Sequence, residues 1–440
     1  DLAEQERCRC IVEQEILAVG HSIYGWRQVP VDVHALGDKA NATRPEIEQI
    51  MFSMPAGLGE EEAERQLYVV RRRIEKAVTA ELISDFYICS MSSRSIIYKG
   101  MFLAEQVTAF FPDLLDTRFI SSFAIYHQRY STNTMPTWKL AQPFRVLAHN
   151  GEINTIRGNQ NWMTCHEDRM ASPLFGDMVE ELKPVVAKGS SDSSALDAVF
   201  ELIGHGGRSL PMVKTIMIPA AVDVSGDSEL AKLYAYCNSV MEPWDGPAAI
   251  AAYANNWVIA GLDRNGLRPM RYVVTNDGLV IAGSETGMVV VPEDRIVERG
   301  RIGPGQMMGI DLARGEMFSN DALKAELAGK RDWGQWTSRA QQMNALLAQN
   351  GGKAPARMDT LDARRRQLMA GWTMEDLELI LHPMAETGKE AVGSMGDDTP
   401  LAVLSNRYRG LHHFFRQNFS QVTNPPIDSL RERHVMTLRT

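Results

Sequence analysis

The chain has 440 residues, of which 44% are apolar and 23% are charged, and its net charge is −9. This composition is typical of a globular protein and excludes a largely disordered chain. The acidic balance, without any basic stripe, argues against nucleic acid and anionic membranes as partners. At this length we expect two domains, because one hydrophobic core seldom organises so many residues.

Targeting and redox signals predict a cytoplasmic location. The first seven residues are acidic and polar, unlike a signal peptide, and no uncharged apolar run reaches the roughly 18 residues that span a membrane. The cysteines are few and scattered, which indicates reduced thiols rather than a disulfide framework. They are Cys8, Cys10, Cys89, Cys165 and Cys237. No metal-binding or nucleotide-binding motif is present, so the 440 residues themselves are expected to hold no cofactor.

Apolar periodicity predicts several helices in the first half of the chain. The clearest covers 60–82, with apolar residues every three or four positions and the run Arg71–Arg73 expected on a solvated face. The other helices are expected at 4–20, 101–111 (ended by Pro112), 160–171, 192–203 and 228–241. Residues 21–33 look extended, and short strands are predicted at 86–89 and 96–98.

From residue 247 the pattern changes to short strands separated by tight turns. They are expected at 248–253, 257–261, 270–275 and 279–283, with a hairpin over 307–318. Turns this short imply antiparallel pairing. Helices, then strands, then more helices predict a layered α+β fold and not a dinucleotide-binding βαβ fold. A linker-like segment at 349–357 precedes predicted helices at 359–369 and 374–381 and a strand at 399–404.

The most informative stretch is 125–158, where two short apolar runs each end in polar groups. Such runs predict buried strands, and strand ends are where sites tend to be built. Arg129, after the first run, offers a planar fork of donors that suits a carboxylate. Asn150 and Gly151, after the second, place a side-chain amide beside an unobstructed backbone N–H, which suits an oxygen that gains negative charge. Taken singly, Asn-Gly is also a common hairpin turn, and Arg129 could simply be solvated.

Asp192 opens the helix predicted at 192–203, and two interpretations of it remain open. It could be the N-cap of that helix, a role worth about 1 kcal/mol. Ser194, with Asp197 three residues later, could be the cap instead, which would leave the Asp192 carboxylate free to face a ligand.

Three segments in this order resemble the glutamine-binding core of the class II glutamine amidotransferases, the N-terminal-nucleophile hydrolases. They are HQRYSTNT (127–134), AHNGEINT (148–155) and SDSSALD (191–197), and Arg129, Asn150 and Asp192 are 21 and 42 residues apart. Within this class the resemblance is to the large subunits of the glutamate synthase family, and it extends to FRQNFSQVTNPPIDSLRER near the end of the chain. It implies a four-layer αββα sandwich of two antiparallel sheets.

The resemblance also assigns roles to individual residues. It implies that Asn150, through its side chain, and Gly151, through its backbone N–H, form the oxyanion hole. Arg129 would hold the α-carboxylate of L-glutamine, Asp192 its α-ammonium group, and Thr132 would be a further substrate contact. The reaction would be hydrolysis of L-glutamine to L-glutamate and ammonia, with an N-terminal cysteine thiolate as the nucleophile.

The chain departs from the family in beginning with Asp1, and neither Cys8 nor Cys10 is terminal. The leading segment with the nucleophile is therefore expected to be absent, so that the 440 residues alone would be inactive. Residues 1–350 are expected to form the glutaminase domain, and 351–440 a linker and the start of a second, α/β domain. The alternatives are another class II amidotransferase, or a non-catalytic module that binds glutamine or glutamate.

The resemblance further implies parts outside this chain. In the whole enzyme, later domains with FMN and an iron–sulfur cluster would receive the ammonia by an internal channel and use it to convert 2-oxoglutarate to glutamate. Partners would be L-glutamine, those domains, and a small electron-donating subunit.

Overall fold

The computed structural model describes residues 2–128, 135–285, 287–341, 343–349, 359–388, 391, 394–395, 406 and 421–422. The chain divides into two units, Asp1–Ser338 and Arg339–Thr440, which are considered separately. Arg129, Thr132 and the strand expected at 399–404 lie outside the described residues.

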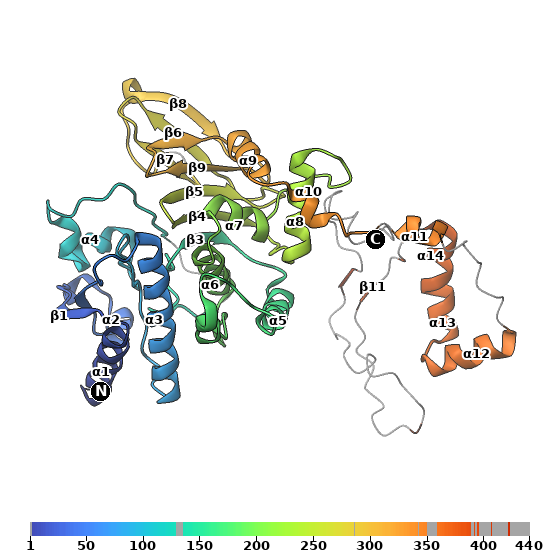
Figure 1. Cartoon of the computed structure of the whole chain (residues 1–440), viewed down its shortest axis with the longest axis horizontal. Helices are drawn as coiled ribbons and strands as arrows, with labels where there is room; N and C mark the ends of the chain where they lie inside the picture. Colours follow the sequence, from blue (N-terminus) through green and yellow to red (C-terminus); the bar gives the residue numbers. More distant parts are fainter. Residues whose placement is uncertain are drawn as a thin grey trace. The chain divides into compact units, whose positions relative to one another are not determined.

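The first unit has an antiparallel five-stranded sheet at its centre, in the order β10-β9-β5-β4-β3 (Figure 1). A three-stranded antiparallel sheet follows the order β7-β6-β8, and β1 pairs with β2. The strands are β1 (Ser22–Gln28), β2 (Glu48–Ser53), β3 (Leu147–Gly151), β4 (Ala248–Ala254), β5 (Trp257–Leu262), β6 (Arg271–Thr275), β7 (Val280–Gly283), β8 (Ile296–Arg301), β9 (Met307–Asp311) and β10 (Glu316–Phe318). The expected α+β class with two antiparallel sheets is confirmed.

Helices precede, interrupt and follow these strands. The longer ones are α1 (Leu2–Ala18), α3 (Glu60–Ala80), α5 (Ile156–Glu167), α6 (Asp192–His205), α7 (Leu210–Met217), α8 (Glu229–Val240) and α9 (Asn320–Gly329). The shorter ones are α2 (Asp38–Ala42), α4 (Val107–Phe110), α10 (Trp333–Thr337) and the 3₁₀ turns η1 (Val33–Ala35), η2 (Ala104–Gln106), η3 (Pro112–Leu115), η4 (Gly176–Leu182) and η5 (Glu293–Arg295).

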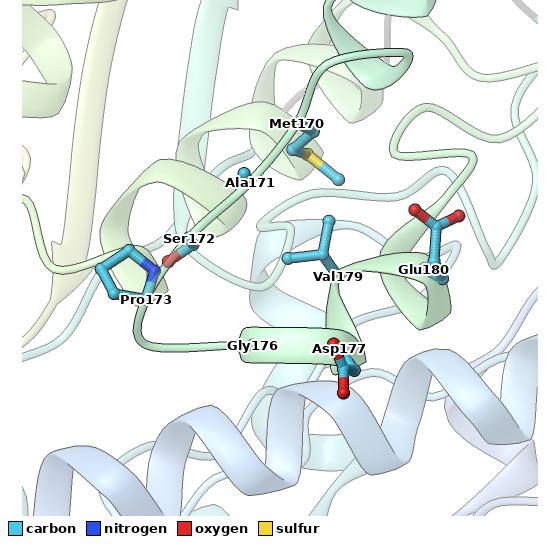
Figure 2. A pocket seen from close by; sticks show the side chains of 8 residues that line it. All are labelled: Met170, Ala171, Ser172, Pro173, Gly176, Asp177, Val179 and Glu180. Atoms are coloured by element: carbon cyan, nitrogen blue, oxygen red, sulfur yellow. The ribbon is translucent and has the colours of Figure 1, made fainter.

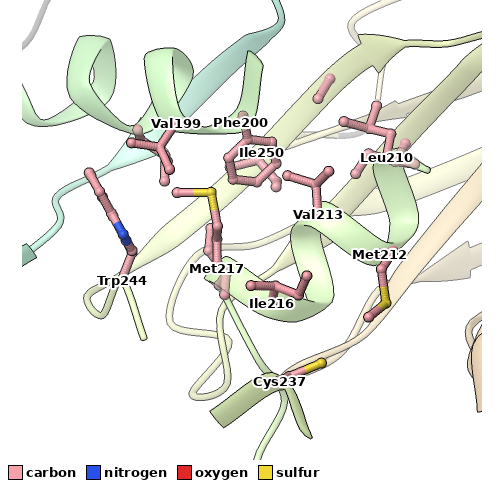
Figure 3. Packing of buried hydrophobic residues seen from close by; sticks show 14 of the residues in the cluster. Val199, Phe200, Leu210, Met212, Val213, Ile216, Met217, Cys237, Trp244 and Ile250 are labelled. Carbon is pink, nitrogen blue, oxygen red and sulfur yellow. The ribbon is translucent and has the colours of Figure 1, made fainter. Parts of the chain in front are cut away.

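The two faces of the five-stranded sheet are buried against different layers, because side chains alternate along a strand. Ile250 and Ala252 of β4 pack with Val199, Phe200 and other apolar residues of α6, α7, α8 and α9 (Figure 3). Ala249, whose side chain is on the opposite face of β4, packs instead with the three-stranded sheet in a cluster that includes Met270 and Val280. The order of layers is therefore helices, five-stranded sheet, three-stranded sheet.

Helix α3 follows its apolar periodicity, with Leu67, Val70, Ile74 and Val78 all buried. It ends at Ala80 because Leu82 takes a positive φ of 61°. The expectation of a solvated Arg71–Arg73 face is wrong for Arg71, which is 2% exposed and bonded to Glu75 and Glu201. Its charge stays buried because two carboxylates compensate it.

Some predicted elements are absent from the described residues. Segments 86–89, 96–98 and 125–128 are not strands there. The Ile88 carbonyl accepts from the Arg145 guanidinium rather than from a neighbouring strand. The helix expected at 101–111 is reduced to η2 and α4, although it does end before Pro112.

The second unit, in its described residues, has α11 (Met343–Gln349), α12 (Thr360–Met369), α13 (Met374–Asp376), the π-helical turn η6 (Leu377–Leu381), α14 (His382–Thr387) and the short pair β11 (Ser394–Met395) and β12 (Gln421–Val422). Asp359 caps α12, and Thr373 with Asp376 forms a capping box at α13. The helices predicted at 359–369 and 374–381 are thus present. No helix among the described residues is long and apolar enough to cross a membrane.

Candidate active site at the end of strand β3

Strand β3 carries Asn150 and Gly151 at its C-terminal end, on the margin of the five-stranded sheet. Among the described strands it pairs only with β4, with Asn150 opposite Ala249 and Gly151 opposite Ala248. The Tyr253 N–H donates to Val146 O at 2.8 Å, and the Glu152 N–H donates to Pro247 O at 2.9 Å. In an antiparallel pair such bonds recur at every second residue. Asn150 therefore bonds to β4, while the Gly151 N–H points away from β4, toward the open margin.

Gly151 is required by the close approach of the next chain segment. Its φ is +155°, and a Cβ at this position would lie 1.8 Å from the Pro247 carbonyl oxygen. Any other residue would push β3 and β4 apart at this point. The backbone N–H is therefore not shielded by a side chain of its own residue.

The Asn150 side chain lies on the face that packs against the three-stranded sheet. Its Nδ2 donates to Ser284 Oγ at 3.3 Å, and Ser284 directly follows β7. An amide has two N–H groups, so the second can donate to a ligand. The site thus offers a side-chain donor and a backbone donor from adjacent residues.

Asp192 is brought to this strand end by helix α6. Its Oδ2 accepts from the Ile153 N–H at 2.9 Å, two residues beyond Gly151. Both interpretations of the helix cap are wrong: Ser191 is the N-cap, accepting from the Ser194 N–H at 3.1 Å. The Asp192 Oδ1 accepts from Ser193 Oγ at 3.4 Å, and a carboxylate oxygen can accept a further hydrogen bond from a ligand.

His149 lies on the opposite face of β3 from Asn150 and is 2% exposed. Its Nδ1 is 2.7 Å from Ser193 Oγ, a second link between β3 and α6. Burial lowers the pKa of His149 to about 4, the Asp192 carboxylate opposes this, and the positive groups His127 and Arg268 add to it. The ring is therefore neutral at pH 7.

The sequence did not single out several residues that support this strand. Asp197 Oδ1 accepts from the N–H groups of Val146 and Leu147 at 2.8 and 3.0 Å. The Gln142 side chain bonds both backbone groups of His149. These partners are separated by up to 51 residues, and no local pattern announces them.

Four of the cysteines lie on helices, and Cys89 lies in a half-buried segment without regular structure. Burial raises the pKa of the Cys237 thiol to about 12, and burial also raises the pKa of Cys8 and Cys89. Such thiols stay protonated at pH 7 and are poor nucleophiles. Among the described residues, no group of three His, Cys, Asp or Glu side chains is placed to hold a metal ion.

A pocket of about 540 Å³ is lined by the segment that joins α5 to α6 (Figure 2). Its lining runs from Met170 to Glu180 and includes the acidic side chains Asp177 and Glu180. None of the residues predicted for the glutamine site lines it.

Residues 1–336 match the glutamine amidotransferases class-II, and the chain belongs to this family. Residues 365–440 match the glutamate synthase central domain. The predicted resemblance is therefore confirmed.

Named relatives agree with both matches. The chain is 61% identical to "Glutamate synthase [NADPH] large chain" of Azospirillum brasilense, over 100% of this chain and 29% of that protein. It is 43% identical to "Ferredoxin-dependent glutamate synthase 2" of Synechocystis, over 99% of this chain and 28% of that protein. The chain thus spans less than a third of the length of these relatives.

A solved structure of glutamine phosphoribosylpyrophosphate amidotransferase from B. subtilis, complexed with ADP and GMP, aligns with a TM-score of 0.25 and 22% identity. The alignment covers 44% of this chain and 33% of that chain, and a likeness this low supports no conclusion.

Proposed function

We propose that this chain binds L-glutamine at the end of β3 and supplies the oxyanion hole for its hydrolysis to L-glutamate and ammonia. The observation that carries the proposal is the Gly151 N–H, which the strand register turns away from β4, next to the Asn150 amide. Two donors on adjacent residues can together stabilise an oxygen as it becomes negative. Removing one such donor typically lowers kcat by about 10²–10³-fold.

The remaining contacts orient the substrate. Asp192 Oδ1 receives the α-ammonium group, while Oδ2 stays bonded to Ile153 and holds the carboxylate still. Arg129 binds the α-carboxylate and Thr132 makes a further contact. Together they recognise an α-amino acid at one end and leave the side-chain amide of glutamine to reach Asn150 and Gly151.

In the longer protein, we propose that the ammonia is consumed in the reductive formation of glutamate from 2-oxoglutarate, as the names of the relatives suggest. FMN, an iron–sulfur cluster and an electron-donating small subunit belong to that step. An iron–sulfur cluster needs grouped cysteines, which the scattered thiols of this chain do not provide. We place the boundary between the amidotransferase part and the central part near residue 350.

Calorimetric titration of the chain with L-glutamine and L-glutamate tests the binding proposal. Arg129→Ala and Asp192→Asn should each weaken binding by about 10-fold or more, because a hydrogen bond to a charged group is worth about 1.5–3 kcal/mol. The carboxamide introduced by Asp192→Asn keeps an oxygen that accepts from Ile153, so the strand end keeps its shape. Arg118→Ala is the matched control, because this arginine is 88% exposed and pairs only with nearby Asp116 among the described residues. Wild-type affinity in Asp192→Asn, or no binding by the wild type, would contradict the proposal.

A further inference from the structure

Among the described residues, the outer margin of β3 is satisfied by side chains and a loop N–H instead of by another strand. Leu147 donates its N–H to Asp197 at 3.0 Å and accepts from the Phe144 N–H at 2.9 Å. His149 donates its N–H to Gln142 Oε1 at 2.7 Å and accepts from Gln142 Nε2 at 2.9 Å. Outward-facing backbone groups recur at every second residue, so the next in this series is the Gly151 N–H.

Gln142 thus takes the place of a strand residue opposite His149. Its carboxamide offers one acceptor and one donor, the same pair that a backbone residue would present. An unpaired strand edge can pair with other chain segments. The Gln142 side chain satisfies this edge at His149 but does not extend further along β3. Within the described part of the chain, this cover ends at His149, one outward-facing position before the N–H of Gly151.

Gln142 is itself held in place by a buried lysine. Lys99 is 6% exposed, and its Nζ donates to the carbonyls of Lys139 and Ala141, both at 2.8 Å. A third bond goes to the Tyr87 hydroxyl at 3.0 Å. Lys99 therefore fixes the segment that leads into Gln142, which gives the carboxamide a defined position relative to β3.

We propose that Gln142 is a positioning residue for the oxyanion hole: it fixes the backbone of β3 at His149 and thereby aims the Gly151 N–H at the substrate oxygen. This inference rests on the proposed function, because it assumes that Gly151 donates to the bound substrate. Gln142 does not contact the substrate. Its loss disturbs the direction of one donor and leaves the groups that bind the amino-acid end of glutamine in place.

The test observes the Gly151 amide directly. The sequence contains three Asn-Gly pairs, at 150–151, 265–266 and 350–351, so a chain labelled with ¹³C′ asparagine and ¹⁵N glycine gives three selected amide signals. Asn150→Asp removes the Gly151 signal and identifies it. L-Glutamate is then added, because one oxygen of its γ-carboxylate occupies the position of the oxyanion. In the wild type we expect the Gly151 signal to shift on binding.

Gln142→Met removes both bonds to His149, and Gln142→Glu keeps only the acceptor. We expect the glutamate-induced shift of Gly151 to be lost in the first and reduced in the second. The affinity for L-glutamate measured by calorimetry should fall by no more than about 10-fold, because the amino-acid end is still held and one hydrogen bond to the γ-carboxylate is weakened. Gln106→Met is the matched control, since Gln106 also bonds one backbone N–H and one carbonyl, of Leu103 and Ala35. It should respond as the wild type does.

The outcomes separate this inference from the proposed function. If Gly151 responds in both Gln142 variants as in the wild type, the positioning role is refuted and the function stands. If the wild-type Gly151 signal does not move although glutamate binds, the oxyanion role itself is refuted. Should Gln142→Met fail to fold, Gln142→Glu decides between the first two results.

Discussion

The carboxylate of Asp197 on helix α6 accepts a hydrogen bond from the Leu147 N–H of β3 at 3.0 Å. The same carboxylate accepts from the N–H groups of Val146 and Arg145, at 2.8 and 3.2 Å. Five residues earlier, Asp192 bonds to Ile153 beyond the other end of the strand. One helix therefore holds both ends of the strand that carries the proposed oxyanion donors.

Asp197→Ala should destabilise the fold by about 2–4 kcal/mol, because it leaves buried backbone N–H groups without an acceptor. Asp197→Asn should cost less, since its one oxygen can still serve Val146 and Leu147. Burial and the nearby Glu201 raise the pKa of Asp197 to about 6, so urea unfolding at pH 8 compares the ionised wild type with the variants. Asp227→Ala, at a side chain 99% exposed, is the control and should change stability by less than about 0.5 kcal/mol. Equal stability of Asp197→Ala and the wild type would refute the role of Asp197 in holding β3.

Gly151→Ala and Gly158→Ala should have opposite effects on stability. The first places a Cβ 1.8 Å from the Pro247 oxygen and should cost about 2–4 kcal/mol. The second lies within helix α5, where a Cβ meets nothing within 4 Å, and should stabilise by about 0.5–1 kcal/mol. Thermal unfolding of both variants checks the pair, and a neutral Gly151→Ala would show that the β3–β4 approach is looser than described.

The pH dependence of stability should carry the signature of His149. Its pKa of about 4 in the folded protein is below the ordinary value of 6.5. As the pH falls below 6.5 the unfolded chain takes up a proton that the folded chain refuses, so stability is present above 6.5 and is lost down to about 4. The loss amounts to roughly 3 kcal/mol. His149→Gln should flatten unfolding curves in this window, whereas the exposed His34→Gln should not. A wild-type slope in His149→Gln would contradict this.

Glu75 should dominate the pH dependence of stability in a more acidic range. Burial alone would raise the pKa of Glu75, but the guanidinium groups of Arg71, Arg145 and Arg72 outweigh it and lower the value to about 2. Its contribution is therefore complete above about 4.5 and is lost as the pH falls toward 2, roughly 3 kcal/mol in all.

Glu75→Gln should reduce stability at pH 7 by about 2–4 kcal/mol, because Arg71 and Arg145 lose a charged, partly buried partner. It should also make the acid limb below about pH 4.5 shallower. Glu293→Gln is the matched control, at a glutamate 80% exposed that pairs with Arg299. The same acid limb in Glu75→Gln and wild type would show that another carboxylate is responsible.

Sequence patterns predicted the elements whose burial follows one simple period. Helix α3 buries one stripe, and β4 to β7 are bounded by tight turns, so their existence was predictable. Helix α7 was missed because all its residues, including Lys214, are buried, which leaves no polar face to reveal a helical period. Strand β8 was missed for the opposite reason, since it is largely exposed and polar.

For the site, the resemblance indicated Asn150, Gly151 and Asp192, and the fold places these three near one strand end. Their assigned roles remain predictions, as do those of Arg129 and Thr132, which lie outside the described residues. Gln142 and Asp197 were not predictable, because they act on backbone groups that only the fold brings within reach. A side chain that substitutes for a missing strand leaves no periodic trace in the sequence.

Asn150 and Gly151 are neighbours in the chain, yet each donor is held by a different sheet. The side-chain amide of Asn150 is hydrogen-bonded to Ser284, at the end of a strand of the three-stranded sheet, whereas the Gly151 backbone belongs to the five-stranded sheet. The distance between the two donors therefore depends on the spacing between the two sheets. A change in that spacing, even one caused far from β3, would alter how well the two donors stabilise a substrate oxygen.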